Sequence, residues 1–164
     1  MSHKLSAEFV REHLTYSDKG QLHWSEDVKN PRKGKRAGYL NPKDGRRYIR
    51  VHGKLYQESH IVWLWHFGEL PTELDHKDKN RENNKIENLR VCTRSENLMN
   101  KGKRPENTSG YKGVFKNGQK GWMARCCKKY LGTYSDKEKA AEAYNKYARE
   151  TFGPFAELNE VKYG

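Results

Sequence analysis

The chain has 164 residues, with 33 Lys or Arg against 21 Asp or Glu, a formal charge of +12 at pH 7 and a mean hydropathy of −1.19. This length allows one domain or two small ones, each with a modest core. No run of about 18 apolar residues and no apolar N-terminal stretch is present, so we expect neither a membrane span nor export. The three cysteines form no C-x-x-C pair, which argues against a zinc knuckle, and their odd number suits a reducing cytoplasm.

The basic residues are concentrated in two segments. Residues 29–54 contain ten Lys or Arg against one acid, and residues 107–130 contain six and no acid. Such segments favour a polyanion through counterion release. A solubilising surface is the alternative, but such surfaces usually mix both signs. The charge pattern therefore predicts a nucleic acid as the partner.

Short elements are predicted in the first half of the chain. A helix begins after Ser6, which can cap it, and Leu5 and Val10 can form a hydrophobic staple. Strands follow at 21–24, 48–51 and 55–56, with a basic loop at 29–36. Residues 59–67 form an apolar helix that ends at Gly68. A histidine on such a helix is more often packed than catalytic, so a role for His60 stays open.

The densest set of polar side chains follows that helix: Asp75-His76, Asn83-Asn84, Asn88-Leu89-Arg90 and Asn97. The pattern predicts a strand at 73–76, a polar loop to 84, a strand at 88–92 and a helix from about 94. Such a ββα unit can bring the oxygens of Asp75 and Asn97 onto one hard cation, Mg²⁺ or Mn²⁺ rather than Zn²⁺, and leave His76 facing the substrate. An Asx-rich surface hairpin is the alternative interpretation.

The segment DHKDKNRENNKIENLRVCTRSEN resembles the ββα-metal (His-Me finger) motif of HNH endonucleases, in the phage and intron-encoded homing branch. ESHIVWLWHFGELP resembles the segment that precedes the motif in that branch. The resemblance implies that His76 is the general base that activates water, and that Asp75 and Asn97 are the metal ligands. It also implies that Asn88 braces the loop and orients the base.

A second domain is predicted after a polar linker at 101–109, so the two domains are 1–104 and 105–164. Strands are expected at 111–115, 122–127 and 130–134, with a turn at Lys128-Lys129. A helix then runs to about residue 152, capped by Ser135 with Glu138 completing a capping box. Alternation along the middle strand places Trp122, Ala124 and Cys126 toward the helix and the intervening side chains on the open face.

These residues resemble the APETALA/ethylene-response-factor DNA-binding domain at YKGV, W-x-A, YLGTY, EKAAEAY and AELN. The resemblance implies a three-stranded antiparallel sheet packed on one helix, with the sheet in the major groove. Lysine at two positions where arginine is usual, and Phe115 at another, lower the expected sequence specificity. A packing module without DNA contact is the alternative. The expected DNA contacts are Lys112, Lys116, Arg125, Lys128 and Tyr130 here, and Arg46, Arg47 and Arg50 in the first basic segment.

Together these features predict an α+β, two-domain endonuclease that hydrolyses phosphodiesters of double-stranded DNA with Mg²⁺ or Mn²⁺, of the phage homing type. One active site predicts nicking by a monomer, and a double-strand break requires a DNA-induced dimer or a second event. We expect it in the cytoplasm, that of the bacterial host if a phage encodes it. The alternatives are a DNA-binding protein with an inactive nuclease site and a structure-specific junction nuclease.

Overall fold

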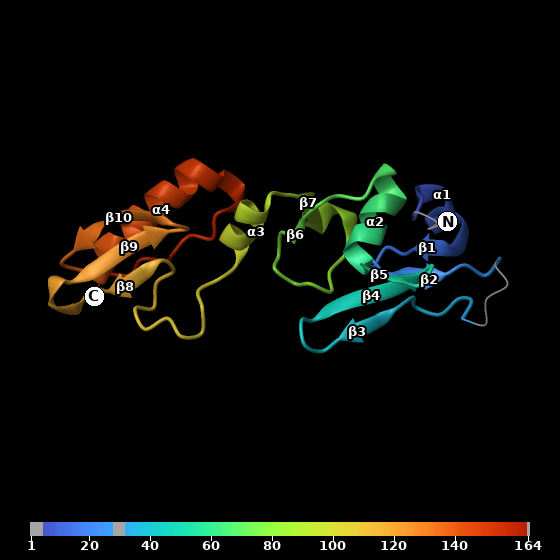
Figure 1. Cartoon of the computed structure of the whole chain (residues 1–164), viewed down its shortest axis with the longest axis horizontal. Coiled ribbons are helices and arrows are strands. Elements are labelled where there is room, and N and C mark those ends of the chain that lie inside the picture. The colour runs from blue at the N-terminus through green and yellow to red at the C-terminus, as the bar shows by residue number, and fades with distance from the viewer. Residues whose placement is uncertain (1–4, 28–31, 164) are drawn as a thin grey trace. The chain divides into compact units, whose positions relative to one another are not determined.

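The computed structural model describes residues 5–27 and 32–163, and its chain divides into two compact units between Thr93 and Arg94 (Figure 1). Part of the predicted basic loop, residues 29–31, lies outside the described residues. Within the described part, no helix has the length and apolar character needed to cross a bilayer. The first unit contains α1 (Ala7–His13), β1 (Leu14–Tyr16), β2 (Leu22–Trp24), β3 (Tyr39–Asn41), β4 (Arg46–Val51), β5 (Lys54–Gln57), α2 (Glu58–Phe67), β6 (Leu74–His76), the 3-10 turn η1 (Ile86–Asn88) and β7 (Leu89–Val91).

Three small antiparallel sheets build the first unit: β1 with β2, β3–β4–β5, and the hairpin of β6 with β7. Strands β1 and β3, at three residues each, were not predicted. The predicted cap of α1 is confirmed, since the Ser6 hydroxyl accepts a hydrogen bond from the Phe9 backbone at 3.2 Å. The predicted end of α2 is also confirmed, with Gly68 at a φ of 81°.

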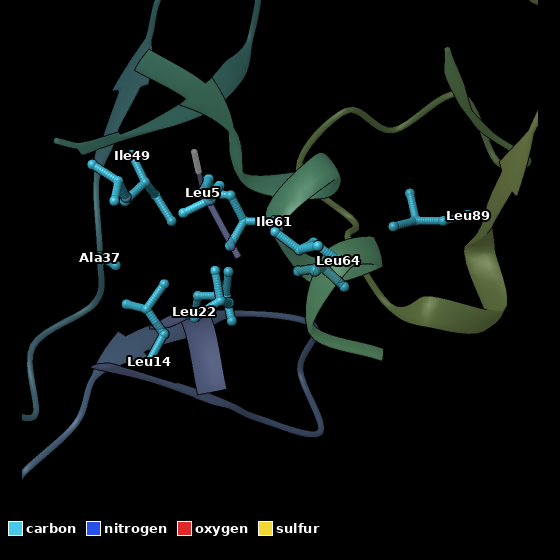
Figure 2. Close-up of a cluster of buried hydrophobic side chains, with 11 residues drawn as sticks. Leu5, Leu14, Leu22, Ala37, Ile49, Ile61, Leu64 and Leu89 are labelled. Carbon is cyan, nitrogen blue, oxygen red and sulfur yellow. The ribbon is translucent and has the colours of Figure 1, made fainter. Parts of the chain in front are cut away.

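The core of this unit forms between the two helices and the β1–β2 and β3–β4–β5 sheets (Figure 2). Leu14 and Leu22 contribute from the first sheet, Ile49 from β4, and Ile61 and Leu64 from α2. Leu89 of β7 belongs to the same buried cluster, and Figure 2 shows it on the side of Leu64. Burial of these side chains excludes water from their apolar surface and holds the β6–β7 hairpin to α2.

The second unit contains α3 (Arg94–Asn100), β8 (Val114–Lys116), the 3-10 turn η2 (Gly118–Lys120), β9 (Trp122–Cys126), β10 (Lys129–Tyr134), α4 (Lys137–Phe152) and the 3-10 turn η3 (Gly153–Phe155). The order β10–β9–β8 is antiparallel throughout, and α4 packs on this sheet (Figure 1). The predicted three strands and one helix are therefore present. Ala124 and Cys126 are buried toward α4 while Arg125 is exposed, as the alternation predicted.

Two local predictions for this unit were wrong. The residue that precedes α4 as its N-cap is Asp136, and the Ser135 hydroxyl donates to the Asp136 carboxylate instead of capping the helix. The hairpin between β9 and β10 turns at Cys127-Lys128, and Lys129 already pairs with Cys126. Cys127 adopts a φ of 54° there, a left-handed conformation that is uncommon for a cysteine and that no neighbouring residue signals.

The boundary between the compact units lies before α3, whereas the linker prediction placed it at 104/105. Met99 of α3 is buried with Cys126 and Tyr144, and its carbonyl accepts a hydrogen bond from the Glu157 backbone at 3.1 Å. The end of the predicted linker is also ordered, because the buried Ser109 hydroxyl is within 2.8 Å of the Val114 carbonyl. Helix α3 thus packs with the second unit, although it follows β7 directly in the sequence.

Candidate functional site

The β6–β7 hairpin brings three of the predicted site residues together. Asp75 lies opposite Arg90 in the register and His76 lies opposite Leu89. Both Asp75 and His76 are buried, with 5% of each residue's surface exposed. Asn88 immediately precedes β7, and its carbonyl accepts a hydrogen bond from the Lys77 backbone at 2.9 Å. Asn97, the other predicted metal ligand, lies on α3 in the second unit.

Asn88 holds the loop that connects the two strands. Its Oδ1 accepts from the Asp78 backbone N–H at 3.1 Å, and its Nδ2 donates to Asp78 Oδ1 at 2.9 Å and to the Asn83 carbonyl at 2.8 Å. Side-chain amides that bond backbone groups in this way fix turns. The Asn88 side chain thus hydrogen-bonds residues at both ends of the loop.

Asp78 is the acceptor at the centre of this loop. Besides Asn88, its carboxylate accepts hydrogen bonds from the Asn80 backbone at 2.8 Å and the Asn83 side chain at 2.7 Å. Partial burial raises the pKa of Asp78, but the hydrogen bonds from Asn83, Asn80 and Asn88 outweigh it, and the net pKa is lowered. The loop is therefore organised around an ionised carboxylate.

A chain of two hydrogen bonds connects His76 to helix α2. Its Nε2 lies 2.9 Å from Oδ1 of the buried Asn84, whose Nδ2 donates to Oε2 of Glu58 at 3.0 Å. Glu58 is the first residue of α2 and is fully buried. Gly20 permits the close approach of the loop, since a Cβ at this glycine would lie 2.4 Å from the Lys85 nitrogen.

Burial lowers the pKa of His76, the hydrogen bond with Asn84 opposes this, and the charge of Arg46 lowers it further. The net shift keeps the imidazole neutral near pH 7, the form that a general base requires. His60 of α2 is close enough for its pKa to be affected by His76 and Arg46, although burial is the main cause of its lowering. His60 also lines an open cavity of about 300 Å³ with Tyr48, Gln57 and Leu70.

Asp75 makes an ion pair with Arg90, whose Nε and Nη2 both donate to Asp75 Oδ2, at 2.9 and 2.7 Å. These contacts fix the orientation of the carboxylate. A carboxylate oxygen and a side-chain amide oxygen are ligands suited to Mg²⁺ or Mn²⁺, so the chemistry of Asp75 and Asn97 fits such an ion. Among the described residues, no group of three or more His, Cys, Asp or Glu side chains is arranged to bind a metal.

The β3–β4–β5 sheet presents a basic and aromatic surface. Arg46, Tyr48 and Arg50 alternate on β4 with Ile49 and Val51, which are buried. An open cavity of about 360 Å³ adjoins this surface, lined by Trp24, Arg32, Arg36, Gly38, Tyr39, Tyr48 and Arg50. Cations interleaved with aromatic rings suit phosphates and bases.

Arg47, the third predicted contact on β4, points toward the interior. Its Nε lies 3.9 Å from the Glu58 carboxylate, its Nη1 donates to the Gly38 carbonyl at 3.1 Å, and 15% of its side chain is exposed. The side chain therefore supports the fold more directly than it offers a charge to DNA.

The open face of the second unit's sheet carries Arg125 and the exposed rings of Phe115 and Tyr130. Tyr130 lies opposite Arg125 in the register, and both Lys116 and Lys128 are exposed near the strand ends. Lys112 behaves differently, because its Nζ donates to the carbonyls of Met99 and Lys101, both at 2.5 Å. Its charge thus neutralises the carbonyl end of α3.

Comparison with known proteins bears on the segment that includes the hairpin. Residues 56–99 match the family model of HNH endonucleases. This segment is similar to the HNH endonuclease domain. The chain is also 32% identical over 117 residues to an uncharacterized HNH endonuclease of Acanthamoeba polyphaga mimivirus. That alignment covers 68% of this chain and 60% of the relative, so the chain spans less than two thirds of the relative's length. No solved structure matches.

The HNH match supports the predicted nuclease class, and the structure adds residues that sequence reasoning did not assign to the site. Asn84 and Arg90 were part of the recognised pattern but had no role. Glu58 begins the flanking segment that resembles the same branch, but it had no assigned role, because an acidic residue at the start of a helix is explained by the helix dipole alone. Only the fold shows that the Glu58 side chain is buried beside Asn84.

Proposed function

We propose that the protein is a metal-dependent endonuclease that hydrolyses phosphodiesters of double-stranded DNA, with His76 as the general base. The observation that carries the proposal is a buried histidine held at Nε2 on a hydrogen-bonded hairpin, inside the segment that matches HNH endonucleases. The mimivirus relative supports the nuclease class. The homing type is part of the proposal and rests on the resemblance of the motif.

In this mechanism His76 takes a proton from a water molecule, which attacks the phosphorus in line with the leaving 3′-oxygen. The resemblance of the motif assigns Asp75 and Asn97 as the ligands of a divalent ion, Mg²⁺ or Mn²⁺, which would supply charge stabilisation for the phosphorane-like transition state. Arg90 orients Asp75, and Asn88 keeps the loop in place beside His76. One such site cuts one strand, so we expect nicking by the monomer.

Two basic surfaces support DNA as the substrate. In the first unit, Arg46 and Arg50 lie with Tyr48 on the outer face of β4. In the second unit, Arg125 and Tyr130 lie on the open face of a sheet, which we propose is an APETALA/ethylene-response-factor-like module. Both surfaces would contact mainly phosphates, which position a protein on DNA without reading its bases.

The test is nicking of supercoiled plasmid by the full chain in Mg²⁺, in Mn²⁺ and in excess EDTA. Conversion to the open circle in either metal, and none in EDTA, is the expected result. Undiminished cutting in EDTA would contradict the metal requirement, and binding without cutting would favour an inactive nuclease. A four-way junction and a linear duplex of matched composition complete the experiment. Preference for the junction regardless of sequence would favour a structure-specific nuclease.

A further inference from the structure

Glu58 occupies an unusual position for a charged side chain. It is fully buried at the start of α2, and the partners that the described structure gives its carboxylate are all donors. The Leu22 backbone N–H donates to Oε1 at 3.0 Å, and Asn84 Nδ2 donates to Oε2 at 3.0 Å. Arg36 donates to the same Oε2 at 3.3 Å. An ionised carboxylate can only accept hydrogen bonds, so it suits this set of donors.

This acceptor determines which way the Asn84 amide points. If the amide were flipped, its Oδ1 would face the Glu58 carboxylate, and two acceptors would lie in contact without a hydrogen between them. Asn84 is 1% exposed, so water cannot relieve that contact. The Nδ2 group must therefore face Glu58, and Oδ1 faces His76.

An acceptor 2.9 Å from His76 Nε2 requires a hydrogen on that nitrogen. In the neutral imidazole the lone pair is then on Nδ1. We infer that Glu58, acting through Asn84, holds His76 as the Nε2–H tautomer and so makes Nδ1 the atom that removes the proton from water. This inference rests on the proposed function. Glu58 and Asn84 are positioning residues, and His76 remains the catalytic one.

The hydrogen-bond pattern identifies a variant that should reverse the tautomer. In Glu58→Gln, one of the two carboxylate oxygens, which both accept hydrogen bonds, is replaced by an amino group that donates. The Leu22 N–H is fixed in β2 and buried, so the amide oxygen should face it, while Arg36, with 27% of its side chain exposed, can turn to solvent. The new amino group then faces Asn84, so the Asn84 amide must flip to accept from it. The Asn84 amino group then donates to His76 Nε2, and the ring hydrogen of His76 moves to Nδ1.

A compensating change should restore the original arrangement. In the double variant Glu58→Gln with Asn84→Asp, the amide introduced by the first change donates to the carboxylate introduced by the second. That carboxylate in turn accepts from His76 Nε2. The Leu22 N–H, the introduced amino group and His76 Nε2–H then each meet an acceptor, Arg36 turns to solvent as in the single variant, and the total charge equals that of the wild type. Glu87→Gln is the matched control, because Glu87 is an exposed glutamate on η1 in the same unit.

The direct measurement is long-range ¹H–¹⁵N correlation NMR of the metal-free, full-length protein labelled at histidine, at about pH 8, where imidazole is neutral. We expect Nε2–H in the wild type, Nδ1–H in Glu58→Gln, and Nε2–H in both the double variant and Glu87→Gln. Amide spectra of each variant report whether it is folded. The wild-type spectrum requires no substitution, and Nδ1–H there would overturn the inference.

Single-turnover plasmid cleavage provides the functional readout. Glu58→Gln should lower the cleavage rate by roughly 10- to 10⁴-fold, the upper value being typical of a catalytic histidine in the wrong tautomer. DNA affinity should not change, and the double variant should recover most of the rate. A Glu58→Gln protein that keeps Nε2–H, or one that changes tautomer and cleaves normally, would overturn the inference. If the wild type cleaves no DNA, the proposed function fails, while the spectra still decide whether Glu58 sets the tautomer.

Discussion

Asp75 and Arg90 face each other across the β6–β7 hairpin, and two Arg90 nitrogens donate to a single Asp75 oxygen, Oδ2. The pair is largely removed from water, with 6% of the Asp75 side chain and 16% of the Arg90 side chain exposed. Such a pair costs desolvation energy, and its two hydrogen bonds fix the orientation of the carboxylate. Here it aligns the carboxylate next to His76, which links the stability of the hairpin to the geometry of the candidate site.

Replacing Arg90 by Leu should destabilise the first unit. The change leaves the Asp75 carboxylate buried without its cation, and breaking a buried pair in this way costs about 3 kcal/mol. Urea unfolding of the full chain, followed by tryptophan fluorescence, measures the loss. Arg50→Leu is the control, since Arg50 is an exposed arginine on a strand of the same unit. Equal effects of the two changes would show that the Asp75–Arg90 pair has no special role.

His76→Ala should lower the rate of DNA cleavage by roughly 10²- to 10⁴-fold, the usual contribution of a positioned general base. DNA affinity should stay within a few-fold, because a neutral side chain adds little to binding of a polyanion. Single-turnover cleavage and a filter-binding titration measure the two quantities. His13→Ala, at the end of α1, should cleave like the wild type. Wild-type cleavage by His76→Ala would remove His76 from the mechanism.

The sequence predicted the elements whose signals are local. Ser6 and Gly68 marked helix ends, and alternation along β9 identified Ala124 and Arg125 on opposite faces. The resemblance of the hairpin segment also implied a bracing role for Asn88, and its side chain does bond the loop between β6 and β7. Contacts between residues distant in sequence left no such signal. The hydrogen bond from Asn84 to Glu58 joins residues 26 positions apart, and only the packing of α2 beside the loop brings them together.

The positions of Lys112 and of helix α3 illustrate the same limit. The composition of residues 101–109 suggested a linker, since polar residues with glycine and proline usually connect domains. The burial of Met99 with Tyr144 instead joins α3 to the second unit. Lys112 then bonds the carbonyls at the end of α3, a role that no spacing within its own segment could indicate.

The pH dependence of cleavage should reflect the lowered pKa of His76. The neutral imidazole is the active form, so the rate should fall on the acid side, with an inflection below the ordinary value of 6.5. A bound divalent cation would shift the inflection in the same direction. Folding stability should also decrease as the pH falls below 6.5, because the unfolded chain then binds a proton more readily than the folded one. An inflection of the rate above 6.5 would contradict the burial of His76.

Asn88→Ala should loosen the loop between β6 and β7. The change removes three hydrogen bonds, including those to the Asp78 backbone and the Asn83 carbonyl, and we expect a loss of about 2 kcal/mol in unfolding free energy. Amide hydrogen exchange at Asp78 should accelerate beyond what the global loss explains. Asn80→Ala is the control, because the Asn80 side chain is exposed and bonds only locally to the Glu82 backbone. Equal exchange rates at Asp78 in both variants would refute the brace.

The open sheet face of the second unit should act mainly through phosphates. The triple variant Lys116→Ala, Arg125→Ala and Lys128→Ala removes Arg125 from that face and two exposed lysines near the strand ends. Each lost phosphate contact lowers the slope of log K against log salt by about 0.9, so the slope should decrease by roughly 2–3. A second triple variant, Lys139→Ala, Lys146→Ala and Arg149→Ala, removes the same charge from exposed positions of α4. Its slope should change by less than about one unit, because its cations lie on the helix and not on the open sheet. DNA affinity against salt, measured for both variants and the wild type on one duplex, separates direct contact from net charge. Equal slopes for the two triple variants would show that this sheet does not contact DNA.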